Sequence, residues 1–554
     1  MELNRLEEAL ESSKKSVSLD AENMDIRKLH LEIECRHQSQ LEEEQLQALS
    51  PSEREKLLVI DEFLEKARMS DQTPLDDDDL LQLLKSCTEE CTNNLMAQVH
   101  FRLSGALSAA VDWWLRSPHD KIAPELLRLI SSAIDKQQLS ISLIDNRGLP
   151  FALMELVIAS KSPSRDNAQG LEVLCRCCSP AAPMNLKAAI LNNSLLLNAV
   201  CILLQTSAAS CQQLGEMVSL LGTFLSFLRL SVFSDEGRCA VEKCSELVFS
   251  LALLLYTQSY SPLWGEIIAV LVGCSQLVKL RESFLTPVAN GLTLLVILLK
   301  KIREIPDEAC NCLAILINLT SESTETARAE IAKNGGFEIA TSVLNTLNPQ
   351  VDFGETYALR CYHLLSRIAV LKEIKNKLYN TSYYSVICQG IKDTTNYVYH
   401  EGPSFEMQKC GYLINIMASL NSPSAECRAV ANNLCLVKHL LAIFPEPRQD
   451  LGVITPESVV QVPKKSAPLI LMGNTARCLM PFADDPVSFQ DIYTNRILMG
   501  IEKLVCSMAT CTDIRVRKNI AILLAKGCRD PSVRQRVSEL RGIQMMVELQ
   551  DRLL

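Results

Sequence analysis

Aromatic residues are scarce in this chain of 554 residues. They make up 5% of the sequence, and glycine occurs only 20 times. Leu, Ala, Ile and Val dominate the 48% of hydrophobic residues, and this composition favours helices over sheets. Because one globular core rarely absorbs so many apolar residues, the composition indicates several domains or one elongated helical array.

Long apolar runs are also missing. The two longest, Leu247–Tyr256 and Gly291–Leu299, span 10 and 9 residues, about half of what a bilayer requires. The first residues are charged from Glu2 onward and contain no apolar signal core. We therefore expect a cytoplasmic protein without membrane insertion.

A basic stripe is not evident in the sequence. The formal net charge is −10, and short pairs such as Lys464-Lys465 stand among scattered Lys and Arg residues. A nucleic-acid-binding surface usually concentrates positive charge. The sequence therefore predicts protein partners and no nucleic acid.

Cysteine is plentiful, with 22 residues, but it follows no disulfide framework. Cys310, Cys312 and Cys410 lie inside apolar helical runs, where a free thiol packs as a small hydrophobe. The densest cluster is Cys175-Arg176-Cys177-Cys178. Adjacent helical positions point about 100° apart, so this cluster is a poor chelate, and no H-E-x-x-H motif is present. We expect no metal site.

Catalytic motifs are missing as well. Asn334-Gly335-Gly336 is not followed by Gly-Lys-Ser/Thr, and no G-x-S-x-G elbow occurs. The sequence therefore predicts a protein that is not an enzyme and has no cofactor.

Residues 1–80 differ from the rest of the chain. They are rich in Glu, Lys, Gln and Ser, and they include the acidic run Asp76–Asp79. Such a segment buries too little apolar surface to fold alone. We expect a polar helical or disordered N-terminal arm, with a helix starting at Ser50-Pro51. The acidic run is interpreted as a solvated linker or a cluster at a helix N-terminus.

Residues 81–554 consist of apolar helices separated by polar turns, and the turns recur every 40 to 50 residues. Gly148 and Ser194 are 46 positions apart, and Gly500 and Gly542 are 42 apart. Three-helix units of this length cannot bury their own apolar faces, so they stack and share a core. About eight such units fit between residues 90 and 554. Glycine or asparagine at the turns indicates backbone with positive φ.

These turns resemble the armadillo repeat superfamily. The best copy is Cys312–Leu344, in which Asn318 occupies the asparagine position of the third helix and Gly335-Gly336 form the turn. The resemblance implies an all-α, right-handed, armadillo-like superhelical solenoid of about eight degenerate repeats. It also implies that the protein works as a non-enzymatic protein-binding scaffold.

The third-helix asparagines are the first candidates for partner binding. In import adaptors of this superfamily, W-x-x-x-N motifs hold an extended peptide. Here Asn318 and Asn415 keep the asparagine, but Ala314 and Gly411 replace the tryptophan, so an import adaptor is not expected. Alignment of the other third helices places Arg176, Pro481 and Lys526 near the asparagine position. Asn318 and Asn415 have two interpretations, partner contact or packing between repeats.

Trp113 and Trp114 are the second candidates. They are adjacent, so one helix face cannot cover both unless a neighbouring layer packs on them. They are interpreted either as an exposed interaction anchor or as part of a buried capping layer.

The C-terminal stretches Leu469–Val505 and Lys518–Leu549 resemble the armadillo region of a family of axonemal dynein preassembly factors. That family also carries tetratricopeptide repeats, for which the roughly 80 polar residues here are too few. The resemblance implies an assembly factor that binds dynein chains and chaperones, in the cytoplasm and associated with cilia. The alternatives are a structural subunit or adaptor of another cytoskeletal or trafficking complex, and a regulator of a small GTPase.

Overall fold

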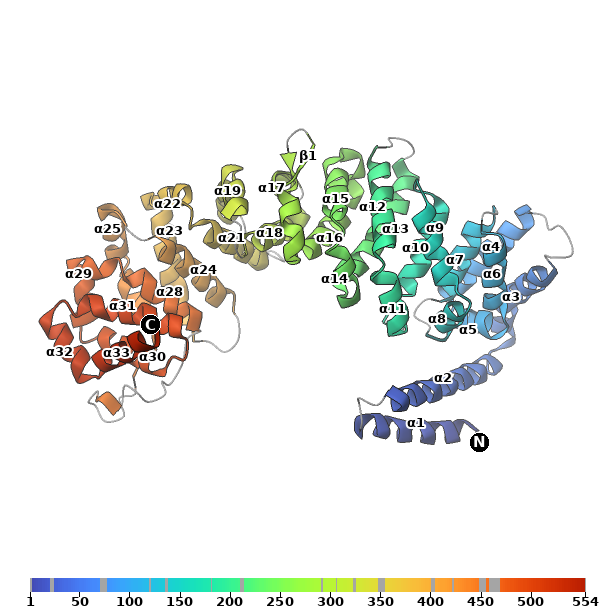
Figure 1. The fold of residues 1–554 in the computed structure, drawn as a ribbon, viewed down its shortest axis with the longest axis horizontal. Coiled ribbons are helices and arrows are strands. Elements are labelled where there is room, and N and C mark those ends of the chain that lie inside the picture. The colour runs from blue at the N-terminus through green and yellow to red at the C-terminus, as the bar shows by residue number, and fades with distance from the viewer. Residues whose placement is uncertain are drawn as a thin grey trace. The chain divides into compact units, whose positions relative to one another are not determined.

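The computed structural model describes residues 2–19, 24–69, 77–118, 121–134, 138–180, 182–209, 214–289, 292–304, 306–321, 325–346, 354–399, 404–420, 423–447, 455–457 and 469–553. The chain divides into two compact units, unit 1 (Met1–Gly291) and unit 2 (Leu292–Leu554). Within the described residues almost all regular structure is helical (Figure 1). The two exceptions are strands of three and two residues, one in each unit.

The elements of unit 1 are α1 Glu2–Leu19, α2 Met24–Gln47, α3 Pro51–Met69, α4 Asp77–Asn93, α5 Leu95–Leu103, α6 Ala106–Arg116, α7 Ala123–Ala133, α8 Gln138–Asn146, α9 Leu149–Ala159, α10 Arg165–Arg176, α11 Met184–Leu191, α12 Ser194–Ala209, α13 Leu214–Phe233, α14 Asp235–Val241, α15 Glu246–Tyr256, η1 Gln258–Leu263, α16 Trp264–Gln276, η2 Val278–Leu285 and β1 Pro287–Ala289.

The elements of unit 2 are β2 Leu292–Thr293, α17 Leu294–Glu304, α18 Pro306–Thr320, α19 Glu325–Lys333, α20 Gly336–Thr346, α21 Gly354–Ile368, α22 Lys372–Leu378, α23 Thr381–Thr394, η3 Thr395–Tyr397, α24 Phe405–Ser419, α25 Ala425–Asn433, α26 Leu436–Leu441, α28 Leu469–Leu479, η4 Phe482–Asp484, α29 Pro486–Phe489, η5 Gln490–Thr494, α30 Gly500–Thr510, α31 Ile514–Gly527, α32 Pro531–Glu539 and α33 Gly542–Leu553.

In unit 1, α-helices that are three apart in chain order pack on each other and form two rows. Helices α4, α7, α10, α13 and α16 form one such row, which we call the third helices of unit 1 (Figure 1). Helices α3, α6, α9, α12 and α15 form a second row, the second helices. The short helices α5, α8, α11 and α14, of seven to nine residues, connect the rows. Each helix buries its apolar side against neighbours in both rows, which is the logic of a solenoid.

Unit 2 repeats this arrangement. Its third helices are α18, α21, α24, α28 and α31, each packed on the next. Across the described residues, each unit contains four complete triplets of a first, a second and a third helix. The predicted all-α, armadillo-like solenoid of about eight repeats is therefore confirmed. The repeats arise because no triplet covers its own apolar surface.

A residue in the left-handed region precedes the second helix in five triplets and helix α33 in the C-terminal pair α32–α33. In three of these places it is glycine, namely Gly105, Gly148 and Gly335, as expected for a turn with positive φ. In the other three it is Cys435, Met499 or Arg541. The sequence-based assignment of Gly500 and Gly542 to this position was therefore wrong by one residue, because these glycines begin helices α30 and α33.

The glycine that follows the turn has a different role. A Cβ on Gly336 would lie 2.8 Å from the carbonyl oxygen of Ile331, and one on Gly542 would lie 3.1 Å from that of Val537. Backbone at that distance cannot move aside as a side chain can. The pair Gly335-Gly336 therefore combines one glycine needed for φ with one needed for close approach.

The solenoid packing begins before residue 80. Helix α3 packs on α4 and α6, and its residues Ile60 and Phe63 are fully buried. The boundary of the arm therefore lies before Pro51, where Ser50 and Glu53 form the expected helix start, with Glu53 accepting from the Ser50 backbone N–H at 2.8 Å. The described part of the acidic run, Asp77–Asp79, forms the first turn of α4.

Helices α1 and α2 pack on each other ahead of this boundary. The Ser13 hydroxyl lies 2.8 Å from His30 Nδ1, between the two helices. An ion pair between Glu42 of α2 and Arg102 of α5 joins them to the solenoid, with side chains 12% and 9% exposed. The polar N-terminal segment is thus helical where it is described.

No single helix in the described ranges is both long enough and apolar enough to span a membrane. Two sharply bent helix pairs, Met184–Leu191 with Ser194–Ala208 and Met217–Phe233 with Asp235–Val241, meet the criterion by length and composition alone.

Candidate functional site

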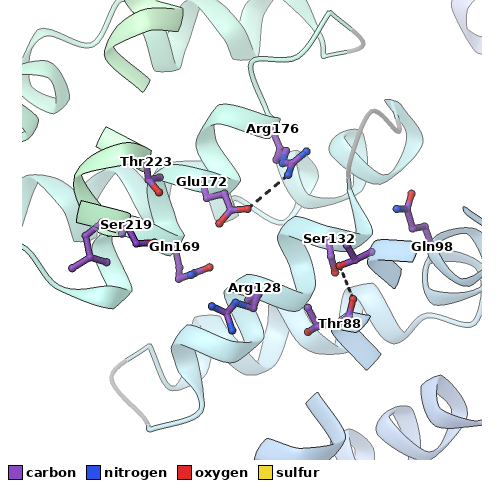
Figure 2. A pocket seen from close by; sticks show the side chains of 12 residues that line it. Thr88, Gln98, Arg128, Ser132, Gln169, Glu172, Arg176, Ser219 and Thr223 are labelled. Carbon is purple, nitrogen blue, oxygen red and sulfur yellow. Dashed lines mark hydrogen bonds and ion pairs between the residues drawn. The ribbon is translucent and has the colours of Figure 1, made fainter. Parts of the chain in front are cut away.

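The third helices of unit 1 enclose a polar pocket, which we call the unit-1 groove. Its volume is about 350 Å³, and α4, α5, α7, α10 and α13 contribute to it (Figure 2). Hydroxyl and amide groups predominate among its side chains. The lining residues are Thr88, Thr92, Gln98, Arg128, Ser132, Ala168, Gln169, Glu172, Arg176, Ser219, Leu220 and Thr223.

The charged side chains that line the unit-1 groove form ion pairs, either with each other or with residues beside the groove. Arg176 lies 3.8 Å from Glu172, a pair visible in Figure 2. Glu125, which is 5% exposed, pairs with Arg128 at 3.3 Å and with Arg165 at 3.2 Å. A buried carboxylate needs such partners, because its desolvation costs several kcal/mol. The groove thus presents mainly neutral hydrogen-bonding groups.

Gln169 lines the unit-1 groove, and its side-chain oxygen lacks a hydrogen-bond donor within the described ranges. Its Oε1 is buried and has no hydrogen-bond partner among the described residues. A buried acceptor without a partner costs about 1–3 kcal/mol. A donor from a bound molecule, such as a peptide N–H, would remove this cost.

The third helices of unit 2 enclose a second pocket, the unit-2 groove, of about 390 Å³. It lies along α21, α24 and α28. The lining residues are His363, Ser366, Arg367, Val370, Tyr412, Asn415, Ala418, Ser419, Asn474 and Arg477.

His363 orients the side chain of Arg367. Its ring stacks on Tyr412 with centroids 4.6 Å apart, and its Nε2 accepts from Arg367 Nε at 3.2 Å. Burial, together with the nearby guanidinium of Arg367, lowers the pKa of His363 from 6.5 to about 4. The ring is therefore neutral near pH 7, with Nε2 free of a proton, and serves as an acceptor for Arg367.

Amide groups join neighbouring third helices of unit 2. Asn474 Nδ2 donates to Asn415 Oδ1 at 2.6 Å, from α28 to α24. One repeat further, Asn519 Nδ2 donates to the carbonyl oxygen of Gly473 at 3.1 Å. These bonds support the packing interpretation of Asn415. Its place in the groove also leaves partner contact open.

The four polar residues proposed from the sequence lie on third helices. Asn318 is half-buried on α18, Arg176 lies in the unit-1 groove and Asn415 in the unit-2 groove. Lys526, on α31, donates to the carbonyl oxygen of Met480 at 3.0 Å and pairs with Asp484 at 2.7 Å. Lys526 is thus engaged in joining α31 to the preceding repeat.

Pro481 does not occupy an asparagine position. It lies beyond the end of α28 and caps η4, whereas Asn474 of α28 is the residue that bonds Asn415.

Trp113 and Trp114 are both buried, with 8% and 2% exposure, on the second helix α6. Trp113 stacks on Phe63 of α3 with centroids 6.4 Å apart. Neither indole is the exposed anchor that one interpretation required. Helix α3 covers Trp113, and α6 also packs on α5 and α7, so its neighbours together bury the two adjacent tryptophans.

The cysteine cluster at residues 175–178 is packed in the interior. Burial raises the pKa of the Cys178 thiol to about 12 and that of Cys177 further. Within the described ranges, no three His, Cys, Asp or Glu side chains come together as metal ligands. Each of these thiols is therefore protonated at neutral pH.

Sequence reasoning missed Arg367, Asn474 and Arg477 as groove residues. In the sequence Arg367 stands more than 100 positions before Asn474 and Arg477, and all three look like ordinary surface residues. The stacking of α21, α24 and α28 brings them to one pocket. Arg367 lies near the end of α21, whereas Asn474 lies in the middle of α28, so no common position within the helices marks the three residues in the sequence.

Comparison with known proteins identifies no family: no family model matches the chain, and no curated protein matches it. Solved structures do match. A chain from the SYS-1/POP-1 complex has a TM-score of 0.57 and 11% identity, covering 98% of this chain and 99% of that one. An engineered protein has a TM-score of 0.54 and 16% identity, covering 84% and 98%. These likenesses concern the fold, which is an armadillo-like helical solenoid.

Proposed function

We propose that this chain is a non-enzymatic scaffold that holds extended segments of partner proteins in its two third-helix grooves. The observation that carries the proposal is the buried, unsatisfied Oε1 of Gln169 in the unit-1 groove. An extended chain exposes a donor and an acceptor at every residue and supplies the missing donor. The SYS-1/POP-1 structure is itself a complex between proteins, which is consistent with this use of the fold.

The groove geometry suits an extended segment. Packed helices are about 8–10 Å apart, and an extended chain advances about 3.3 Å per residue. One repeat therefore matches about three residues of a bound segment. Amide and hydroxyl side chains at this spacing both donate and accept, as a peptide backbone requires.

The described chemistry of the grooves supports binding over catalysis. The histidine of the unit-2 groove is neutral, and its Nε2 is occupied by Arg367. The acids of the unit-1 groove are engaged with arginines. A general base needs a free, correctly placed lone pair. The Nε2 lone pair of His363 is used by Arg367, and an ion pair with arginine makes a carboxylate a weaker base.

A finer proposal concerns the cellular process. The C-terminal stretches resemble the armadillo region of tetratricopeptide repeat protein 12, and on that basis we propose a cytoplasmic, cilium-associated role in preassembly of axonemal dynein arms. The partners would then be dynein chains and chaperones. A fixed subunit or adaptor of another cytoskeletal or trafficking complex, or a regulator of a small GTPase, would bind a different set of proteins.

Site-specific photo-crosslinking tests the scaffold proposal. Benzoylphenylalanine is placed at Thr223 in the unit-1 groove or at Tyr412 in the unit-2 groove of the full chain in ciliated cells. The matched control is Leu195, which is 65% exposed on the second helix α12. We expect defined proteins to crosslink at the groove positions and not at Leu195. Equal labelling at all three positions contradicts the scaffold proposal.

The identity of the crosslinked proteins decides the finer proposal. Dynein chains with chaperones support preassembly. A single set of cytoskeletal or trafficking subunits replaces it with the adaptor role, and nucleotide-dependent capture of a GTPase replaces it with the regulatory role.

A further inference from the structure

The third helices of the two units differ in charge. The five third helices of unit 2, α18, α21, α24, α28 and α31, contain eight Lys and Arg residues against four Asp and Glu, a formal charge of +4. The five third helices of unit 1 contain five Lys and Arg against ten Asp and Glu, a formal charge of −5. The whole chain carries −10. A local excess of cations in an acidic protein needs a physical explanation.

The cations on the third helices of the two units also differ in whether they form ion pairs. In unit 1 the arginines of the third helices from α7 to α13 all have carboxylate partners. These pairs are Arg128–Glu125 at 3.3 Å, Arg165–Glu125 at 3.2 Å, Arg176–Glu172 at 3.8 Å and Arg229–Glu266 at 3.5 Å. The unit-1 groove is therefore internally compensated.

In unit 2 most of the corresponding cations have no carboxylate partner among the described residues. Arg360 donates to the carbonyl oxygen of Cys310, Arg367 to His363, and Arg477 makes a long contact of 3.5 Å with the carbonyl oxygen of Ala418. Lys526 is the exception, since it pairs with Asp484. These contacts use neutral acceptors, so the positive charge of the groove stays uncompensated.

Arg367 and Arg477 are the pair best placed to bind an anion. Both line the unit-2 groove, from α21 and α28. Arg367 is half-buried and held through Nε by neutral His363, so its fork is pre-oriented. A half-buried guanidinium loses part of its hydration, and a carboxylate restores the lost interaction with two parallel hydrogen bonds.

We propose that the unit-2 groove binds an extended acidic segment of a partner protein, with Arg367 and Arg477 pairing with its carboxylates and Asn415 and Asn474 contacting its backbone. This inference rests on the proposed function and adds the charge of the partner. The two arginines belong to helices two repeats apart and their side chains converge on one pocket. The paired acidic residues are therefore roughly four to six positions apart in the bound segment.

A peptide fits the groove better than a nucleic acid. Single-stranded nucleic acids need open aromatic faces on which bases stack. His363 and Tyr412 stack on each other here, which covers one face of each ring. The remaining groups are amides and hydroxyls that match a peptide backbone.

Selection from a peptide library tests the proposal. The full chain is used to select from random peptides of about 16 residues at about 50 mM salt. We expect selected peptides to be enriched in Asp and Glu at the stated spacing, and their binding to weaken at about 300 mM salt. Selected peptides without an acidic excess, or no selected peptides at all, overturn the inference.

Substitution of the arginines locates the binding. In the full chain, Arg367→Gln with Arg477→Gln weakens the selected acidic peptides about tenfold or more, measured by fluorescence anisotropy. The matched control, Lys85→Gln with Arg229→Gln, removes the same charge from third helices of unit 1 outside the groove lining and changes the affinity less than about twofold. Unchanged binding in the first double variant, or equal loss in both, overturns the inference.

A charge-reversal variant and an oligonucleotide probe distinguish the remaining explanations of these results. Arg477 is exposed, so Arg477→Glu tests charge reversal without disturbing the fold, and we expect a larger loss than with Arg477→Gln. A single-stranded oligonucleotide that binds more tightly than the peptides, and that loses binding in the same variants, overturns the choice of partner. If benzoylphenylalanine at Tyr412 captures proteins while no acidic preference is found, the scaffold proposal stands and this inference fails.

Discussion

Asn474 of α28 donates a hydrogen bond of 2.6 Å to Asn415 of α24, across 59 residues of sequence. Both side chains are half-buried in the unit-2 groove. The bond joins two successive third helices at the point where a partner segment is proposed to lie. The same amides thus contribute to the packing of the repeats and to the chemistry of the groove.

A double-mutant cycle on this pair is expected to give a coupling free energy of about 1 kcal/mol. Asn415→Ala and Asn474→Ala each remove the bond, and the double variant costs less than the sum of the single ones. Urea unfolding of the four proteins measures the coupling. Asn93→Ala, at a more exposed amide that bonds only within its own helix, is the control. Additive single effects would show that the bond is not formed in solution.

Replacement of Cys435 by glycine is expected to stabilise the chain by about 1 kcal/mol. Cys435 has φ 53° and is exposed, so the substitution relieves backbone strain without loss of core packing. Cys435→Ala keeps the strain and serves as the control. The free energy of unfolding in urea should therefore rise for the glycine variant only; equal effects of the two substitutions would exclude a strained turn.

Gly336→Ala is expected to cost about 1–3 kcal/mol of unfolding free energy, because the new Cβ would lie 2.8 Å from the carbonyl oxygen of Ile331. Gly411→Ala, within helix α24, is the matched control. A Cβ there meets nothing within 4 Å, so helix propensity alone predicts a gain of about 0.5–1 kcal/mol. Thermal unfolding of both variants measures the difference, and a loss in the control or a gain at Gly336 contradicts the packing described.

Acid is expected to destabilise the unit-2 groove through His363. Its pKa is 6.5 in the unfolded chain and about 4 in the folded protein. Above about pH 6.5 both states are neutral, and between about pH 6.5 and pH 4 only the unfolded chain gains a proton. Stability therefore falls as the pH is lowered through this window, by about 1 kcal/mol after allowance for solvent screening.

Comparison with His363→Gln measures this contribution. Glutamine keeps an acceptor for Arg367 but does not titrate. Urea unfolding at about pH 7 and about pH 5 should show a larger loss for the natural chain than for the variant. Other groups, including His439, whose pKa is also lowered by burial, cancel in the difference. An equal loss would mean that His363 is protonated as readily in the folded protein as in the unfolded chain.

The sequence was sufficient for the fold because hydrophobic periodicity and the turn at Gly335-Gly336 are local features. It was less informative about other turns, since Cys435, Met499 and Arg541 adopt a conformation usually reserved for glycine. Nothing in their side chains predicts positive φ.

The grooves were only partly accessible from sequence. Asn415 and Arg176 were found because they follow the asparagine pattern. Arg367 and Arg477 were not found, because a charged residue in a helix is usually solvated. Whether it lines a groove depends on which helix packs beside it. The tryptophan pair is not an exposed anchor for a similar reason, since the helices packed on α6 bury both side chains.

The contrast between compensated and uncompensated arginines has a consequence for release. A segment held by neutral amides in unit 1 responds little to dissolved ions, whereas one held by Arg367 and Arg477 in unit 2 is loosened as ions screen the guanidinium groups. The two grooves, built from the same repeat pattern, would then release their bound segments at different salt concentrations. The order of release would depend on ionic strength as well as on affinity.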